Sequence, residues 1–130
     1  MTGLVSRPLV AGSGVDAATL PLAHEPLPAE TVLAGAPTAA FTTLVGVGAG
    51  VGSDGGADGV EIGVWEMTPG TASDVETDEV FVVLAGHATI AFDDPALPDL
   101  AVGPGSVVRL AEGQRTVWTV TETLRKIFIA

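Results

Sequence analysis

Apolar and polar residues alternate in short runs from Val60 to the end of the chain. The runs are rich in Val, Ile, Leu, Phe and Trp and are bounded by Gly, Pro or Asp, which is the pattern of β-strands joined by turns. Such runs cover residues 60–67, 79–86, 87–92, 106–110, 116–120 and 124–130, with shorter candidates at 31–33 and 41–45. A helical period of three to four residues is not sustained anywhere. The pattern therefore predicts an all-β sandwich or barrel.

The run from Glu79 to Leu84 is largely apolar on both faces. Alternation gives two sets of side chains: Glu79, Phe81 and Val83 on one face, and Val80, Val82 and Leu84 on the other. A strand of this kind is covered on both sides, either within the chain or at a contact between subunits. We therefore expect a homodimer.

Composition separates an N-terminal arm from the strand-rich part. Residues 1–40 are rich in Pro, Ala and Gly and are expected to pack on a barrel formed by residues 41–130. The glycines between Val45 and Gly59 resemble a phosphate loop, but no Lys-Ser or Lys-Thr pair follows them and acidic residues lie among them. We interpret this stretch as a flexible hairpin connection.

Length and charge narrow the function classes. A chain of 130 residues with 47% hydrophobic content fits one domain. The net charge of −11 disfavours nucleic acid and membrane surfaces as partners. Cysteine is absent, which excludes disulfides and thiol catalysis. With one Arg near the start and no apolar run before a cleavage site, no secretory signal is expected, and the chain is predicted to be cytoplasmic.

Four segments carry a family resemblance: GVWEMTPG, DEVFVVLAG, VGPGS and EGQRTVWTVTETLRK. In this order and spacing, over about residues 31–130, they resemble the single-domain cupins grouped with ureidoglycine aminohydrolase. The resemblance implies a double-stranded β-helix, that is, a jelly-roll barrel. Family enzymes of this type rely on a metal ion held by histidines.

The histidines of that pattern are missing here. Counted back from Glu79, the first two histidine positions fall on Ser73 and Val75, or on Ala72 and Asp74 with the longer spacing. Counted from Gly105 in the second motif, the third falls on Thr116. One carboxylate cannot hold a transition ion alone, so no metal and no cofactor is expected. An all-oxygen site for a hard cation remains open, since further acidic residues cluster near Glu79: Glu66, Asp74, Glu76 and Asp78. The competing interpretation of this cluster is a solvated acidic loop.

The resemblance and the residue types together give a candidate site. The catalytic candidates are Glu79 and Lys126, and the ligand-binding candidates are Trp65, Glu66, Thr116, Trp118 and Arg109. Glu79 is either a general acid or base in the barrel or a strand-end carboxylate that lies in solvent or pairs with Arg109, Arg115 or Lys126. Lys126 either pairs with Glu79 or Glu66 or contacts a ligand, and the tryptophans either pack in the core or form a ligand platform. Of the two histidines, His87 is expected to be exposed or hydrogen-bonded, and His24 is not expected to bind metal.

Three functions remain open. The first is a metal-free cupin that binds a small organic molecule, such as a sugar, an organic acid or a ureide, inside the barrel. The second is an enzyme similar to ureidoglycine aminohydrolase, with proton transfer through Glu79 and charge stabilisation by Lys126. The third is a structural or oligomerisation module whose barrel is filled by its own side chains.

Overall fold

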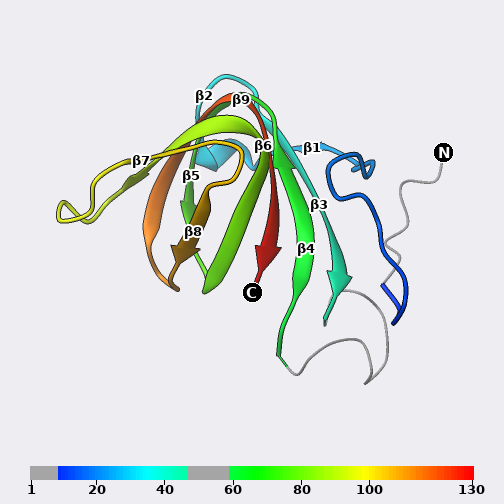
Figure 1. Cartoon of the computed structure of the whole chain (residues 1–130). Helices are drawn as coiled ribbons and strands as arrows, with labels where there is room; N and C mark the ends of the chain where they lie inside the picture. The colour runs from blue at the N-terminus through cyan, green and yellow to red at the C-terminus, as the bar shows by residue number, and fades with distance from the viewer. Residues whose placement is uncertain (1–8, 47–58) are drawn as a thin grey trace.

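The computed structural model describes residues 9–46 and 59–130 (Figure 1). Apart from one short 3-10 helix, η1 (Ala29–Thr31), the regular elements of the described residues are strands. They are β1 (Glu25–Pro26), β2 (Val32–Ala34), β3 (Thr38–Val45), β4 (Ile62–Met67), β5 (Gly70–Val75), β6 (Glu79–Phe92), β7 (Leu100–Val102), β8 (Val107–Leu110) and β9 (Arg115–Ile129). The prediction of an all-β fold is confirmed.

Two long strands, β6 and β9, organise the barrel. They pair antiparallel along almost their whole length, from Val80 opposite Ile129 to Phe92 opposite Thr116. The second half of β9 and the first half of β6 lie in a layer with the order β1-β3-β4-β9-β6-β8. Their other halves lie in a layer with the order β2-β5-β9-β6-β7. One hydrogen-bonded sheet therefore curls over itself into two layers, as Figure 1 shows.

The bend between the two layers lies at Gly86. The β6–β9 register shifts on both sides of this residue, and its φ of +87° is a conformation that favours glycine. A Cβ placed there would lie 1.9 Å from the carbonyl oxygen of Thr123. Only glycine allows the backbones of β6 and β9 to cross this closely while both strands turn into the second layer.

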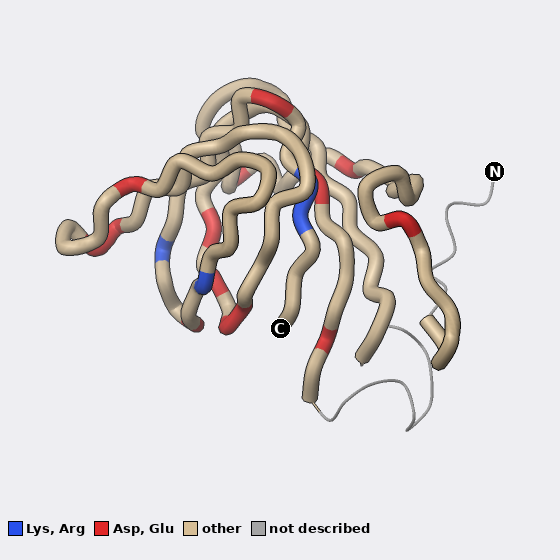
Figure 2. The backbone as a smooth tube through the Cα atoms, in the orientation of Figure 1, with Lys and Arg blue, Asp and Glu red and all other residues tan. Residues whose placement is uncertain are grey.

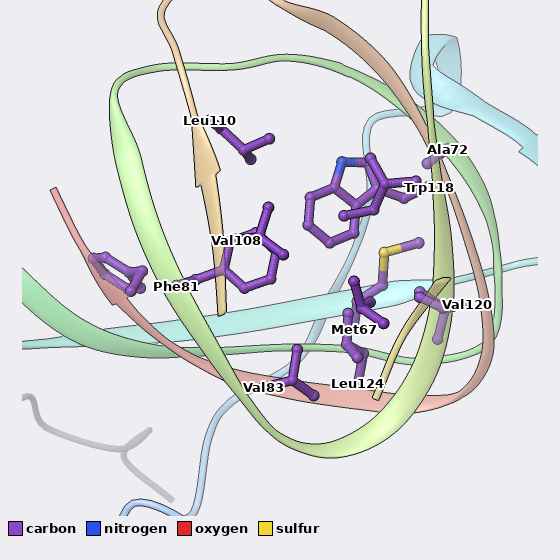
Figure 3. Close-up of a cluster of buried hydrophobic side chains, with 13 residues drawn as sticks. Met67, Ala72, Phe81, Val83, Val108, Leu110, Trp118, Val120 and Leu124 are labelled. Carbon is purple, nitrogen blue, oxygen red and sulfur yellow. The ribbon is translucent and has the colours of Figure 1, made fainter. Parts of the chain in front are cut away.

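The core lies between the two layers. Phe81, Leu110 and Leu124 are completely buried, and burial of one such side chain stabilises the fold by about 1.5–3 kcal/mol. Figure 3 shows side chains from both layers converging on the enclosed space; the labelled ones are Met67, Ala72, Phe81, Val83, Val108, Leu110, Trp118, Val120 and Leu124. They come from β4, β5, β6, β8 and β9, so the core fixes the positions of the strands that line the site described below.

The N-terminal segment packs on the outer face of the first layer. The Arg125 guanidinium donates hydrogen bonds from Nη1 to the carbonyl oxygens of Ala17 and Leu20, at 2.9 and 2.8 Å. The strands β1 and β2 extend the two layers by pairing with β3 and β5. The boundary expected at residue 40 falls inside β3, which begins at Thr38.

Three segments differ from the sequence-based expectation. Residues 79–92 form one strand instead of two, and so do residues 115–129, because the glycine bend keeps the ladder continuous. Residues 70–75 form β5 although the segment TPGTASD has the composition of a turn, because pairing with β9 and β2 satisfies its backbone. Most of the hairpin connection expected between Val45 and Gly59 lies outside the described residues. Within the described ranges, no helix has the length and apolar character needed to cross a membrane.

Candidate functional site

A pocket of about 520 Å³ opens between the two layers of the barrel. Its volume is within the range of small-molecule sites, about 300–1,000 Å³. The apolar part of the lining comes from the arm and from four strands, and includes Leu27, Phe41, Trp65, Met67, Ala72, Trp118 and Phe128. The polar part includes Glu61, Ser73, Asp74, Glu76, Glu79 and Lys126. The pocket thus combines aromatic walls with several charged groups.

Lys126 and Glu79 form an ion pair in this pocket. The Lys126 ammonium donates a hydrogen bond to Oε2 of Glu79 at 2.5 Å, and the two side chains are only 7% and 15% exposed. Lys126 points inward because β9 alternates, which places it on the same face as the core residues Leu124 and Phe128. An ammonium this deeply buried requires compensation, and the Glu79 carboxylate supplies it.

Three aromatic rings surround the same ammonium. The Nζ atom of Lys126 lies 4.2 Å from the ring centre of Phe81, 4.8 Å from that of Trp65 and 5.0 Å from that of Trp118. The faces of such rings attract cations, and the attraction grows when water is excluded. We call these three rings the aromatic cage. The cage and Glu79 together hold a positive charge inside the barrel.

Glu76 is a second buried carboxylate of the pocket, at 7% exposure. Its Oε2 atom accepts hydrogen bonds from Oγ1 of Thr116 at 2.6 Å and from Nε1 of Trp118 at 2.9 Å. Its Oε1 atom has no hydrogen-bond partner among the described residues. Every fully buried polar side-chain atom in this part of the chain does have a partner, so Oε1 is not fully buried. Oε1 therefore lies open to the pocket, where it can accept a hydrogen bond from a ligand.

Asp74 lies at the mouth of the pocket and remains exposed at its surface. Partial burial of the carboxyl raises the pKa of Asp74, and the negative charges of Glu76 and Glu79 raise it further. The Val75 amide and the Lys126 ammonium act in the opposite direction without cancelling the rise. The pocket mouth is therefore a place where negative charge exceeds positive charge.

The sequence family of EutQ-like cupin domains matches residues 55–128. The chain belongs to this cupin family. The match agrees with the curled, two-layered barrel and confirms the jelly-roll expectation.

Solved structures with the same fold share little sequence with this cupin. A protein of unknown function in the DUF861 family, from Pseudomonas syringae pv. tomato, is 22% identical with a TM-score of 0.68, over 91% of this chain and 48% of that one. EutQ from Clostridium difficile is 17% identical with a TM-score of 0.57, over 72% and 67% of the two chains. The putative ethanolamine utilization protein Q from Salmonella typhimurium is 16% identical with a TM-score of 0.55, over 71% and 68%. At these identities the likeness shows the fold alone.

This cupin spans about half the length of the Pseudomonas protein. No curated protein matches it. The membership in a more specific group around ureidoglycine aminohydrolase is not shown by these matches.

The residues of this cupin do not fit the metal that the histidine pattern of other cupins implies. Lys126 places its ammonium 2.5 Å from Glu79, so a cation already faces the retained carboxylate. The Thr116 hydroxyl at the third histidine position donates its hydrogen bond to Glu76. In residues 9–46 and 59–130, no group of three or more His, Cys, Asp or Glu side chains converges closely enough to hold an ion.

The structure brings four sequence-predicted site residues to the pocket, namely Trp65, Glu79, Trp118 and Lys126, and Thr116 contacts it through Glu76. It does not bring Glu66 or Arg109 there. Glu66 follows Trp65 in β4 and must point to the opposite face, where Oε1 accepts a hydrogen bond from Nη2 of Arg125 at 3.0 Å. Arg109 is exposed in β8, between the inward-facing Val108 and Leu110.

The structure shows which ion pairs the charged candidate residues form. Lys126 pairs with Glu79, and Glu66 pairs with Arg125 instead. Of the histidines, His87 is exposed and lies 2.7 Å from Glu122, while Nε2 of His24 lies 3.2 Å from Oε1 of Glu66.

Sequence reasoning missed Glu76 as a site residue, because it belongs to an acidic run that has the composition of a solvated loop. The available signal was alternation, since Ala72, Asp74 and Glu76 share one face if the strand continues to this point. The loop interpretation is wrong for Glu76, which the ladder of β5 with β9 carries into the barrel beside Thr116.

Proposed function

We propose that this cupin binds a small polar organic molecule in the pocket without the help of a metal. The observation that carries the proposal is the Glu76 carboxylate, which is held by Thr116 and Trp118 and keeps Oε1 open to the pocket. A fixed polar group in a mostly aromatic and aliphatic cavity is the usual design of a small-molecule site. Because Thr116 and Trp118 already hold the Glu76 carboxylate in place, less conformational entropy is lost when a ligand binds to it.

The lining favours some of the expected ligand classes over others. Asp74, Glu76 and Glu79 are acceptors when ionised, so they favour molecules with many O–H or N–H donors. Sugars and ureides fit this requirement better than organic acids, whose own carboxylates would be repelled. The tryptophan rings offer apolar faces against which such molecules can stack.

A thermal-shift panel of sugars, carboxylates and ureides tests this proposal. A ligand that binds the native state raises the melting temperature by an amount that grows with the logarithm of its concentration relative to its Kd. The shift should shrink in a Glu76→Gln variant and persist in an Arg109→Gln variant, whose side chain lies outside the pocket. A panel in which no compound stabilises the protein contradicts the proposal.

A second candidate is an enzyme similar to ureidoglycine aminohydrolase. The close contact of Glu79 with Lys126 in the pocket favours it, because a carboxylate can transfer a proton while an adjacent ammonium stabilises developing negative charge. Full turnover of an identified substrate by both Glu79→Gln and Lys126→Ala variants contradicts this mechanism. The third candidate, a filled structural barrel, is disfavoured by the pocket volume.

We further propose that the chain forms a homodimer through the outer face of the first layer. Val64 and Leu44 are buried, but on this face Val107 on β8 is 67% exposed and Ile129 on β9 is 39% exposed. A second copy would bury the same apolar strip by two-fold symmetry. A Val107→Asp variant should then elute as a monomer in light-scattering chromatography, and a monomeric parent protein contradicts the proposal. The cytoplasmic location remains a prediction.

A further inference from the structure

The charges that line the pocket do not balance. Glu79 is neutralised by Lys126 at 2.5 Å, and Glu61 accepts a hydrogen bond from the Thr43 hydroxyl at 2.8 Å. Glu76 receives only the neutral donors Thr116 and Trp118. Asp74 has no ion pair among the described residues. The pocket therefore holds at least two carboxylates that form no ion pair with a cation of the described chain.

The Oε1 atom of Glu76 is the best placed of these acceptors. The residue is more than nine-tenths buried and lines the pocket, so its unpartnered oxygen is accessible from the pocket. A hydrogen bond in which both partners are charged is stronger than one between neutral groups, and burial strengthens it further. A positively charged donor gains most from this position.

The aromatic walls favour the same type of ligand. Trp65 and Trp118 line the pocket with their ring centres 5.8 Å apart. Their contacts with Lys126, at 4.8 and 5.0 Å, show that a positive charge is accommodated beside these rings. The net charge of −11 also raises the local concentration of cations around the protein. Figure 2 shows acidic residues spread over the backbone and basic residues at few places.

We propose that the pocket selects a small organic cation, of the ammonium, amidinium or guanidinium class, which donates a hydrogen bond to Oε1 of Glu76 while its apolar part contacts the tryptophan rings. This inference rests on the proposed small-molecule function and specifies the charge of the ligand. An anion would meet Asp74 and Glu76 without a free counter-charge. A neutral molecule would bind Glu76 without the charge contribution.

Binding of such a cation should be coupled to proton release. The groups that face Asp74 are Glu76, Glu79 and Lys126, and the pKa of Asp74 is raised mainly by its partial burial and further by the two carboxylates. A bound positive charge lowers the pKa of Asp74, so binding releases protons in the pH range in which Asp74 is partly protonated. By the same linkage, the affinity for the cation falls as the pH is lowered through the range in which Asp74 becomes protonated.

Three probes of nearly the same shape test the inference: benzamidinium, benzamide and benzoate, which are positive, neutral and negative. Calorimetric titration of the full chain should give benzamidinium an affinity about tenfold or more above that of benzamide, and no detectable binding of benzoate. Glu76→Gln keeps an acceptor oxygen for Thr116 and Trp118 and should lower the benzamidinium affinity by about tenfold. Glu122→Gln changes the net charge equally at the exposed His87 pair and should leave the affinity unchanged.

Titrations in buffers of different ionisation enthalpy report the proton release directly. Circular dichroism of both variants verifies that they are folded before the affinities are compared. Benzamidinium that binds no tighter than benzamide, or equally well to the Glu76→Gln variant, overturns the inference. Stabilisation by neutral sugars or ureides would still support the proposed function in that case, so the two failures are distinguishable.

Discussion

Arg125 and Lys126 are neighbours in β9 whose side chains are buried on opposite faces of the same layer. The Arg125 side chain is 10% exposed on the outer face, and the Lys126 side chain is 7% exposed inside the barrel. Their ladder partners in β4 are Glu66 and Trp65. One pair of strands thus anchors the N-terminal arm on one side and builds the charged wall of the pocket on the other. Two of the five basic residues of this acidic chain are used at this point.

Replacement of Lys126 should destabilise the fold, because it leaves an unpaired charge inside the barrel. Lys126→Met keeps most of the side-chain volume but leaves the Glu79 carboxylate without its counter-charge, so we expect a loss of about 3–5 kcal/mol of unfolding free energy. The double variant Lys126→Met with Glu79→Gln removes both charges and should recover part of this loss. Denaturant unfolding of the parent protein, the two single variants Lys126→Met and Glu79→Gln, and the double variant gives the coupling energy between the two side chains. If the loss of unfolding free energy in the double variant equals the sum of the losses in the two single variants, the two side chains do not stabilise each other.

The Arg125 guanidinium should control docking of the arm. Arg125→Met removes the hydrogen bonds to Ala17 and Leu20 and leaves Glu66 without the guanidinium, so proteases should cleave the arm faster than in the parent chain. Arg125→Lys keeps the charge but lacks the branched donors, and it should give an intermediate rate. Limited proteolysis followed by mass spectrometry measures both. Equal cleavage rates in all three proteins would show that these contacts do not hold the arm.

Asp74 should give the stability of this cupin a defined pH dependence. The pKa of Asp74 is higher in the folded chain than its ordinary value, so the folded state holds the proton more tightly. Its contribution is fully present below the ordinary pKa and is lost as the pH rises through the raised one. Asp74→Asn should therefore increase the melting temperature slightly at neutral pH and have no such effect in acid. An increase that is the same at both pH values would assign the gain to another cause.

Most strands of the fold could be predicted from the pattern of apolar residues. The strands around Trp65, Phe81 and Trp118 were predictable, because their segments are short runs rich in β-branched and aromatic residues that turn residues bound. The strand β5 was not, because Pro69 and Gly70 have the local chemistry of a turn and only pairing with β9 makes the segment extended. The continuity of β6 through Gly86 likewise depends on a close approach to Thr123, which is a tertiary contact.

Those features of the site that depend on the side-chain alternation within a single strand could be predicted. Alternation within β9 placed Lys126 inside with Leu124 and Phe128, and it separated Lys126 from Arg125. Applied to β4, the same rule excludes a shared pocket role for Trp65 and Glu66. The partners of Glu76 could not be read from the sequence, because Thr116 and Trp118 lie 40 and 42 residues away and meet it only through the β5–β9 ladder.

In this cupin the charge inside the barrel is an ion pair between Lys126 and Glu79, and we expect that no metal ion is bound there. Elemental analysis of protein purified without chelators, then dialysed against Mg²⁺, Mn²⁺, Fe²⁺ and Zn²⁺, tests this most directly. We predict metal far below one ion per chain, unchanged in Glu79→Gln. One ion per chain that disappears in Glu79→Gln would contradict the account.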